Sequence, residues 1–570
     1  MGRRQMMADA YDVIVVGSGA AGSMAAYALT LRGARVCMLE AGRHYDPVLE
    51  TPMWGMDKDA PLRAARTPDK PFGYYDATVD GGWDVPGEPY LSQPDTDFRW
   101  FRARMLGGRT NHWGRVSLRL ADHDFKAASH DGIGVDWPFG YDEIAPWYDK
   151  TEQVVGITGT ADGLADAPDS PAGILHEPPP PRAHELLVME GGRKLGRPVV
   201  ASHIAVITRP TNGRPPCIYA TPCRRGCSIA ANFQSTTVLI PPAIASGHLD
   251  IVTDAMVYEV EIGSDGKATG ISYVDKTLGE HRTVSGRTIV LGASAMESVR
   301  ILMNSKNPRF PDGIGADDGL LGHCISDTIG SSIWAQFPAL ENLPPFNDFG
   351  IWYPHIYIPW WGLDEQRSGA LDFARGYHIE VSGGRWDPGA ETFRHFDSVS
   401  PTAWGAALKA DARRYYGTFV RFAQRGETIP RRQNTVSLHP TVTDRFGIPA
   451  PRFSYQWSEQ EVRQTAHAQK SMAEFIDAAG GRMLDDIPDD VRDAMSKPGE
   501  IIHEVGGARC GTSRNNSVTD PYGRVWGVPN LYVVDGAVFP TNAHKNPTLT
   551  IMAFAWRAAD HIADRAGHGA

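Results

Sequence analysis

The chain has 570 residues, of which 42% are hydrophobic and 22% charged, and its formal net charge at pH 7 is −11. One hydrophobic core usually stops growing at about 250–300 residues, so we expect two domains or one large domain with insertions. The negative charge argues against nucleic acid and anionic membranes as partners. The sequence contains no apolar run of about 18 residues that would form a transmembrane helix, and its start lacks the apolar segment of a signal peptide.

The N-terminal segment has the pattern of a dinucleotide-binding unit. Residues 12–16 are mostly apolar and β-branched, which predicts a buried parallel strand. Three glycines follow at the spacing G-x-G-x-x-G, which permits a tight turn, a close approach of backbone to a pyrophosphate, and close packing of the next helix. These glycines are Gly17, Gly19 and Gly22, with Ala20 and Ala21 between the last two. We therefore predict that this turn binds a nucleotide.

The next elements extend this unit. Residues 23–31 predict a helix that Gly33 ends, and residues 36–40 predict a second strand. Glu40 stands at the end of that strand, where a carboxylate would bind an adenosine ribose. The unit alone does not decide between FAD and NAD.

Later segments predict further pieces of the same sheet. Residues 249–257 predict a strand pair, residues 288–291 a buried strand, and residues 531–534 a last parallel strand. Asn546-Pro547-Thr548 begins a predicted helix that ends near Ile562. The N-terminus of such a helix offers free N–H groups and positive potential to an anion.

Three cysteines lie close together at the spacing C-x5-C-x3-C. They are Cys217, Cys223 and Cys227, in a segment that also contains proline and glycine. Three thiolates in one loop are a ligand set for an iron–sulfur cluster. A disulfide with one free thiol, or a zinc site that lacks a nearby fourth ligand, is the alternative.

The region from 346 to 384 is rich in aromatic residues, including Phe349, Trp352, Tyr353, Tyr357 and Trp360. We expect most of them to pack the back of a sheet, while a few could stack on sugar faces. Residues 434–438 and 444–449 predict a strand–turn–strand unit. Just before it, Glu427 is either a ligand for a substrate hydroxyl or a solvated surface residue.

Two motifs near the C-terminus complete the pattern. His503 opens the run His503-Glu504-Val505-Gly506-Gly507, and Asn546 opens Asn546-Pro547-Thr548. A lone histidine is more often a satisfied structural residue, but a neutral imidazole can also accept the proton of an alcohol. A further segment, residues 106–114, contains the glycine pair Gly107-Gly108, which lets backbone approach a flat ring closely.

Together these motifs resemble the glucose-methanol-choline (GMC) family of flavin oxidoreductases, from about residue 11 to residue 562 with a weaker middle. The resemblance implies an α/β fold, in which a Rossmann-like FAD-binding domain carries an inserted α+β substrate domain built on an antiparallel sheet. The FAD-binding domain would comprise residues 10–45, 100–120, 216–330 and 500–565. The substrate-binding domain would comprise residues 46–99, 121–215 and 331–499.

The resemblance also implies the site residues. His503 would take the proton of a substrate hydroxyl while flavin N5 takes the hydride, and Asn546 would hold the same oxygen. Residues implied to bind FAD are Gly17, Gly19, Ala20, Ala21, Gly22, Glu40, Gly107, Gly108, Asn111, His112, Val257, Ala293, Asp535, Gly536, Asn546, Pro547 and Thr548. His112 corresponds to the histidine that links flavin covalently in pyranose oxidases, and covalent attachment and simple packing beside Trp113 remain open.

The cysteine spacing is similar to that of the flavoprotein subunits of bacterial FAD-dependent glucose dehydrogenases, which carry a [3Fe-4S] cluster. The resemblance therefore implies a dehydrogenase that oxidises a sugar or glycoside, at C3 or C1 of a pyranose, and passes electrons to cytochrome c or another acceptor. A peroxide-forming oxidase and a non-catalytic flavin redox subunit are the alternatives. Relatives can be exported with a small chaperone-like subunit, so both cytoplasm and periplasm remain open.

Overall fold

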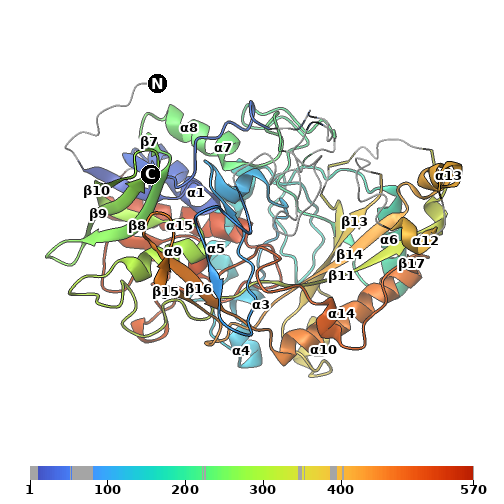
Figure 1. Cartoon of the computed structure of the whole chain (residues 1–570). Coiled ribbons are helices and arrows are strands. Elements are labelled where there is room, and N and C mark those ends of the chain that lie inside the picture. The colour runs from blue at the N-terminus through green and yellow to red at the C-terminus, as the bar shows by residue number, and fades with distance from the viewer. Residues whose placement is uncertain are drawn as a thin grey trace.

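The computed structural model describes residues 10–51, 53, 55, 59, 81–220, 223, 226–344, 350–351, 353–385, 395–400 and 404–568. The predicted aromatic positions Phe349 and Trp352 lie outside these residues. Two large sheets lie at opposite ends of the molecule, and α15 (Thr548–Ala566) and α5 (Tyr141–Val155) run close to the first of them (Figure 1). Within the described residues, no helix combines the length and apolarity needed to cross a membrane.

Among the described residues, the first sheet has seven strands. Its parallel part has the order β7-β2-β1-β10, with β18 on the other side of β10. These strands are β1 (Tyr11–Val16), β2 (Val36–Leu39), β7 (Leu249–Val252), β10 (Glu280–Leu291) and β18 (Leu531–Val533). The first half of β10 instead pairs antiparallel with β9 (Ala268–Asp275), which pairs with β8 (Ala255–Ile262). The predicted strands at both ends of the chain thus meet in one sheet.

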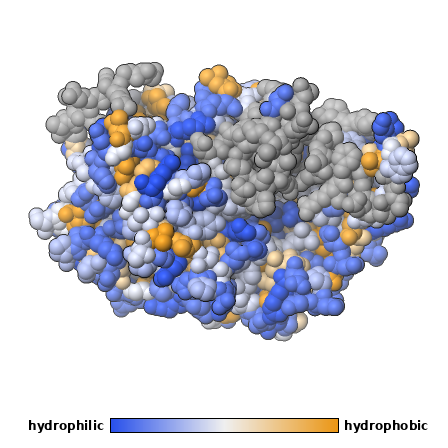
Figure 2. All heavy atoms as spheres, viewed as in Figure 1, coloured by the Kyte–Doolittle hydropathy of each residue, from blue (hydrophilic) through white to orange (hydrophobic). Residues whose placement is uncertain are grey.

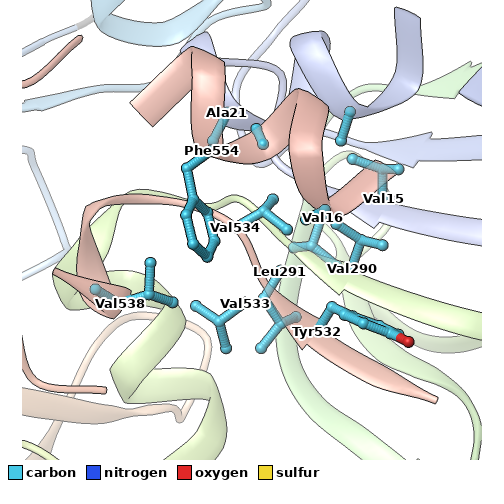
Figure 3. Packing of buried hydrophobic residues seen from close by; sticks show 14 of the residues in the cluster. Val15, Val16, Ala21, Val290, Leu291, Tyr532, Val533, Val534, Val538 and Phe554 are labelled. Carbon is cyan, nitrogen blue, oxygen red and sulfur yellow. The ribbon is translucent and has the colours of Figure 1, made fainter. Parts of the chain in front are cut away.

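Strands β1 and β2 are almost entirely buried, and helix α1 (Ala20–Leu31) packs against both of them, which explains why they are apolar at successive positions. Helix α1 also packs against α15, and Phe554 of α15 points toward the strands that carry Val534 and Leu291 (Figure 3). Phe554 is fully buried, so we expect its replacement by alanine to cost about 3–5 kcal/mol of stability.

The second sheet has six antiparallel strands in the order β17-β11-β14-β13-β12-β6. They are β6 (Val200–Ala201), β11 (Ile329–Gln336), β12 (Ile356–Ile358), β13 (Tyr377–Gly383), β14 (Phe419–Gly426) and β17 (Arg482–Met483). Helices α14 (Glu459–Ala478) and α6 (Ala183–Leu195) contribute to an apolar core with one face of this sheet. Trp360 is buried in that core, which confirms the packing interpretation for this residue.

A separate three-stranded sheet corrects one prediction. The strand–turn–strand unit forms as β15 (Thr435–Thr443) and β16 (Pro449–Ser454), but its third strand is β4 (Leu91–Ser92). The family resemblance implied a substrate-binding domain that includes residues 331–499 and therefore this unit, but the unit does not join the six-stranded sheet. The reason is packing: Phe453 stacks on Phe98 with ring centroids 4.5 Å apart, within the core of the first sheet.

Shorter elements connect these sheets. They are β3 (Gly81–Gly82), β5 (Arg102–Ala103), α3 (Asp122–Phe125), α4 (Ala127–Asp131), α7 (Ser235–Val238), α8 (Ile240–Ala245), α9 (Ala295–Asn304), α10 (Leu363–Arg367), α12 (Phe396–Val399) and α13 (Ala406–Tyr415). The described part of the face in Figure 2 is mostly hydrophilic, with scattered hydrophobic residues.

Candidate active site

The glycine turn after β1 has the shape that a dinucleotide requires. Gly17 has φ +94°, and a Cβ there would lie 2.4 Å from the carbonyl oxygen of Gly292. A Cβ on Gly22 would lie 1.9 Å from the carbonyl oxygen of Gly17, so both positions are closed by packing. A Cβ on Gly19 would meet nothing within 4 Å. The second glycine therefore faces open space, which fits a pyrophosphate at the N-terminus of α1.

Glu40 joins three segments around this turn. One carboxylate oxygen accepts hydrogen bonds from the backbone N–H and the hydroxyl of Ser18, at 3.1 and 2.5 Å, and the other accepts from Gly42 N–H at 2.6 Å. The Ser18 hydroxyl also accepts from Gly107 N–H at 2.8 Å. The backbone carbonyl of Glu40 accepts from Ala255 N–H, which places β8, with Val257, beside it. Carboxylate oxygens have several acceptor sites, so these bonds are compatible with a ribose.

The segment of Gly107 and Gly108 lies against the same turn. Both glycines have positive φ, +89° and +50°, and a Cβ on Gly108 would meet only the Cα of Gly19, at 3.7 Å. Asn111 is buried and donates a hydrogen bond to the Leu106 carbonyl at 2.9 Å. His112 packs edge-on against Phe101, and burial lowers the pKa of His112 to about 3.

The remaining predicted FAD residues are contiguous with this cradle. A Cβ on Gly17 would be in close contact with Ala293 as well as with Gly292. Ala293 N–H donates to the Ser298 hydroxyl, which donates to Asp535. Burial raises the pKa of Asp535 to about 6. The Gly536 carbonyl accepts a hydrogen bond from Gly506 N–H at 2.8 Å, and Gly506 belongs to the segment that begins with His503. Helix α15 begins with Pro547 as its N-cap and Thr548 as its first residue.

The structure brings His503 and Asn546 together. Asn546 Nδ2 lies 3.3 Å from His503 Nε2, and Thr328 Oγ1 lies 3.0 Å from His503 Nδ1. An amide nitrogen only donates, so Nε2 accepts here and Nδ1 carries the proton. Burial lowers the pKa of His503 to about 3; the positive charge of Arg425 adds to the effect and Glu380 opposes it. Asn546 Oδ1 is buried and has no hydrogen-bond partner among the described residues.

A polar face of the six-stranded sheet lies next to this pair. Along β13, Tyr377, Ile379 and Val381 enter the apolar core, whereas His378 and Glu380 point the other way. Glu380 pairs with Arg425 of β14 at 2.8 Å, and Asn546 Nδ2 donates to Glu380 at 3.4 Å.

The prediction did not include Glu380 or Arg425. The alternation of polar and apolar residues in 377–383 is the sequence signal that could have found the first of them.

Arg109 connects the cradle to the histidine segment. Its guanidinium pairs with Glu504 at 2.7 Å and donates to the Ser294 hydroxyl at 3.0 Å. Glu427, in contrast, is buried and pairs with Arg375 at 2.6 Å. The interpretation of Glu427 as a solvated surface residue is therefore wrong, and its role as a ligand for a substrate hydroxyl stays a prediction.

The three cysteines of the loop share an apolar environment. Cys223 and Cys227 are buried, and Cys217 packs against the clusters that contain each of them. Burial, followed by the neighbouring Cys223, raises the pKa of Cys217 to about 12. All six cysteines lie among the described residues and none forms a disulfide, so that alternative is wrong for this structure. The group of described residues whose ligand atoms converge within 4.8 Å is another one, His123, Asp124 and Asp166.

A glycine turn of the dinucleotide-binding type, together with a histidine–asparagine pair beside a polar sheet, is the arrangement expected of a flavin-dependent oxidoreductase. The sequence matches the GMC oxidoreductase family over residues 11–323 in its N-terminal part and 430–555 in its C-terminal part. The chain therefore belongs to the GMC oxidoreductase family, whose members bind FAD, and the predicted recognition and fold class are confirmed.

Proteins of related sequence and fold span the whole chain. A 2-methyl-1,2-propanediol dehydrogenase of Mycolicibacterium austroafricanum is 29% identical, over 98% of this chain and 96% of its own. The fructose dehydrogenase large subunit of Gluconobacter japonicus is 27% identical, over 97% of each chain. The solved structure of a formate oxidase from Aspergillus oryzae superposes with a TM-score of 0.65 over 98% of both chains, at 14% identity, and shares the fold.

Proposed function

We propose that this protein is an FAD-dependent dehydrogenase that oxidises a hydroxyl group of a sugar or glycoside, such as C3 or C1 of a pyranose. The single observation that carries the proposal is the contact of His503 Nε2 with Asn546 Nδ2, beside the ion pair of Glu380 and Arg425. The fructose dehydrogenase and the propanediol dehydrogenase, by their names, act on substrates with neighbouring hydroxyls. Their similarity supports a polyhydroxylated substrate here.

The roles of the side chains follow from their chemistry. FAD, when bound, supplies the two-electron acceptor whose N5 takes the hydride from the substrate carbon. His503 Nε2 can accept the hydroxyl proton when the substrate oxygen takes the place of the Asn546 amide N–H, because its Nδ1 carries the other proton toward Thr328. Asn546 Nδ2 would donate to the reacting oxygen, and the unpartnered Oδ1 is an acceptor that another hydroxyl of the substrate can fill.

The pair of Glu380 and Arg425 is suited to the hydroxyl next to the reacting one. A carboxylate accepts and a guanidinium donates, so together they match a hydroxyl that donates to one and accepts from the other. The pair has no net charge, which favours neutral sugars over ionic substrates. Each side chain is 13–14% exposed, so solvent or substrate reaches both.

Residues of the FAD cradle keep the roles that the family resemblance implied. We propose Gly17, Gly19 and Gly22 at the pyrophosphate, Glu40 at the ribose, and Gly107, Gly108 and Asn111 along the isoalloxazine ring. His112 lies in the same segment, and acid precipitation distinguishes a covalent link from simple packing, because only linked flavin stays with the protein.

We also propose that Cys217, Cys223 and Cys227 bind a [3Fe-4S] cluster that passes electrons from FAD to an external acceptor. Support comes from their shared loop, in which Cys223 and Cys227 are buried and Cys217 packs against the apolar cluster of each. The name of the fructose dehydrogenase large subunit, which implies other subunits in that protein, supports a partner subunit for this chain.

A substrate screen with an artificial dye acceptor tests the function. Purified protein with FAD is incubated without oxygen with pyranoses, glycosides and simple diols, and dye reduction is followed. We expect turnover with a pyranose or glycoside in the absence of oxygen. Turnover that stops without oxygen and yields peroxide would identify the oxidase instead. Flavin that no hydroxyl substrate reduces would favour the non-catalytic subunit.

A further inference from the structure

A buried chain of titratable side chains extends from the polar sheet face to the surface, and the proposed chemistry leaves it unused. Its members come from four places: His378 from β13, His544 and Lys545 from the loop before α15, Asp166 from the loop after α5, and His123 with Asp124 from α3. His378, His544 and Asp166 are at most 3% exposed. Only His123, whose side chain is 17% exposed, reaches solvent appreciably.

Three of the four contacts along this chain are within 3.3 Å, and the fourth, between His378 and Glu380, is longer. His378 Nε2 lies 3.8 Å from Glu380 Oε1, and His378 Nδ1 lies 3.2 Å from His544 Nδ1. His544 Nε2 lies 3.0 Å from Asp166 Oδ1, which lies 3.3 Å from His123 Nε2. Asn546 Nδ2 donates to both His503 Nε2 and Glu380 Oε1, so Glu380 lies next to the proposed base. An amide N–H does not accept a proton, so the proton on His503 must pass to Glu380 directly.

Oxidation of an alcohol transfers the hydroxyl proton to His503, and His503 cannot retain this proton. Burial lowers the pKa of His503 to about 3, so its protonated form must give the proton up. Burial also lowers the pKa of His544, to about 4. At His123 burial is outweighed by Asp124 and Asp166, which raise the pKa. His123, at the surface end, therefore holds a proton more readily than His503 and His544 do. Burial is outweighed by Arg425 at Glu380 and by His544 and Lys545 at Asp166, which lower the pKa of both carboxyl groups, so these two carry a proton only transiently.

We propose that Glu380, His378, His544, Asp166 and His123 form a proton relay that carries the substrate hydroxyl proton from His503 to solvent. The relay rests on the proposed role of His503. In each turnover the substrate C–H bond breaks with its electron pair going to FAD, and the O–H bond breaks with its proton going to His503. One proton enters the relay there and one leaves at His123, so no further reactant is needed.

Charged groups next to the relay contact its side chains but do not carry the proton. Lys545 Nζ donates to Asp124 at 2.6 Å and to Asp166 at 3.0 Å, so its ammonium occupies the space between these carboxylates. This geometry favours charged carboxylates and leaves a metal ion no role at His123, Asp124 and Asp166. The other groups facing the relay are Arg425, which pairs with Glu380, and Tyr357, whose ring lies 5.8 Å from that of His378.

The test measures proton release and flavin reduction together. Protein with bound FAD is mixed anaerobically with substrate in weak buffer with a pH-indicator dye, and both signals are followed by stopped flow. In the wild type we expect them in one phase. In His123→Ala and His544→Gln we expect proton release to lag by roughly 10- to 100-fold, at or below the low end of the effect of a positioned proton-transfer group. His130→Ala, an exposed histidine on neighbouring α4, is the control and should release protons as the wild type does.

Imidazole rescue separates a relay from a structural role. Added imidazole should restore proton release in His123→Ala, because the position is open to solvent, but not in His544→Gln, because that position is buried. His123→Ala with wild-type proton release, or a lag that imidazole leaves unchanged, overturns the relay. Failure of the proposed function looks different: flavin reduction would then be normal in His503→Ala, whereas failure of the relay alone leaves His503→Ala inactive.

Discussion

The side-chain nitrogen of Asn546 lies 3.3 Å from Nε2 of His503, although 43 positions separate the two residues in sequence. The contact fixes the tautomer of the histidine, because an amide N–H can only donate. It also sets Asn546 between His503 and Glu380, the first residue of the sheet face beyond the pair. Proton acceptance, substrate positioning and proton exit therefore meet at one amide group.

Changes at Asn546 should slow flavin reduction less than loss of His503 does. Asn546→Ala removes the group that holds the substrate oxygen but leaves the base. Asn546→Asp places a carboxylate beside Nε2, which should raise the pKa of His503 and add repulsion with Glu380. Anaerobic stopped-flow reduction of both variants checks this order. A larger loss in Asn546→Ala than in His503→Ala would mean that the asparagine, and not the histidine, dominates the chemistry.

The rate of flavin reduction should be nearly independent of pH between about 5 and 9. A group with lowered pKa stays unprotonated down to that pKa, and His503, with a pKa of about 3, is neutral throughout this range. The rate should fall only as the pH approaches that value. From the sequence alone, an ordinary imidazole would instead predict a rise near pH 6.5. A measured midpoint there in the wild type would show that His503 is more solvated than the structure indicates.

Gly19→Val should fold and lose FAD. The φ of Gly19 is −70°, which other residues adopt, and a Cβ there meets nothing in the protein. The side chain would enter the space of the pyrophosphate. Flavin absorbance per chain measures binding, and circular dichroism of the same sample measures folding. Gly19→Ala should show a smaller loss; full FAD content in Gly19→Val would place the dinucleotide elsewhere.

Glu380→Gln should weaken the binding of a substrate most when that substrate carries a hydroxyl next to the reacting one. We expect KM to rise for a polyhydroxylated substrate, with a smaller change for an analogue that lacks the hydroxyl next to the reacting one. The comparison of variant with wild type, on both substrates, isolates that contact. Equal effects on both substrates would assign Glu380 to the orientation of Asn546 alone.

Iron and acid-labile sulfide should be present at about three irons per chain, the content expected of a three-thiolate cluster. Cys223→Ser should leave reduction of FAD by substrate unchanged and slow electron delivery to a large acceptor. Cys510→Ser, at a buried cysteine remote from the loop in sequence, is the control and should retain iron. Background iron with normal turnover would rule the cluster out.

The sequence was a good guide where one local pattern determines one element. The glycine turn, Glu40, and the strands and helix at the C-terminus follow from periodicity and turn chemistry, and the structure places the predicted strands in one sheet. Tertiary packing decided the rest. The strands β15 and β16 paired as expected, but Phe453 joined the core of the other sheet. Glu427 is buried only because Arg375, 52 positions away, pairs with it.

Local sequence patterns also could not predict the environment of His544. It stands two residues before Asn546, and nothing in the adjoining sequence indicates that His378 and Asp166 flank it. Long-range contacts of this kind, at 3.2 and 3.0 Å, appear only once the chain is folded.

The most direct test of the central claim is single-turnover reduction of bound FAD by an identified sugar or glycoside, compared between the wild type and His503→Ala. The claim predicts that the variant retains one FAD per chain and reduces it about 10²–10⁴-fold more slowly, the usual contribution of a general base. His467→Gln, at another partly buried histidine, should reduce FAD at the wild-type rate. Reduction in His503→Ala at the wild-type rate would contradict the claim and make His503 a structural residue.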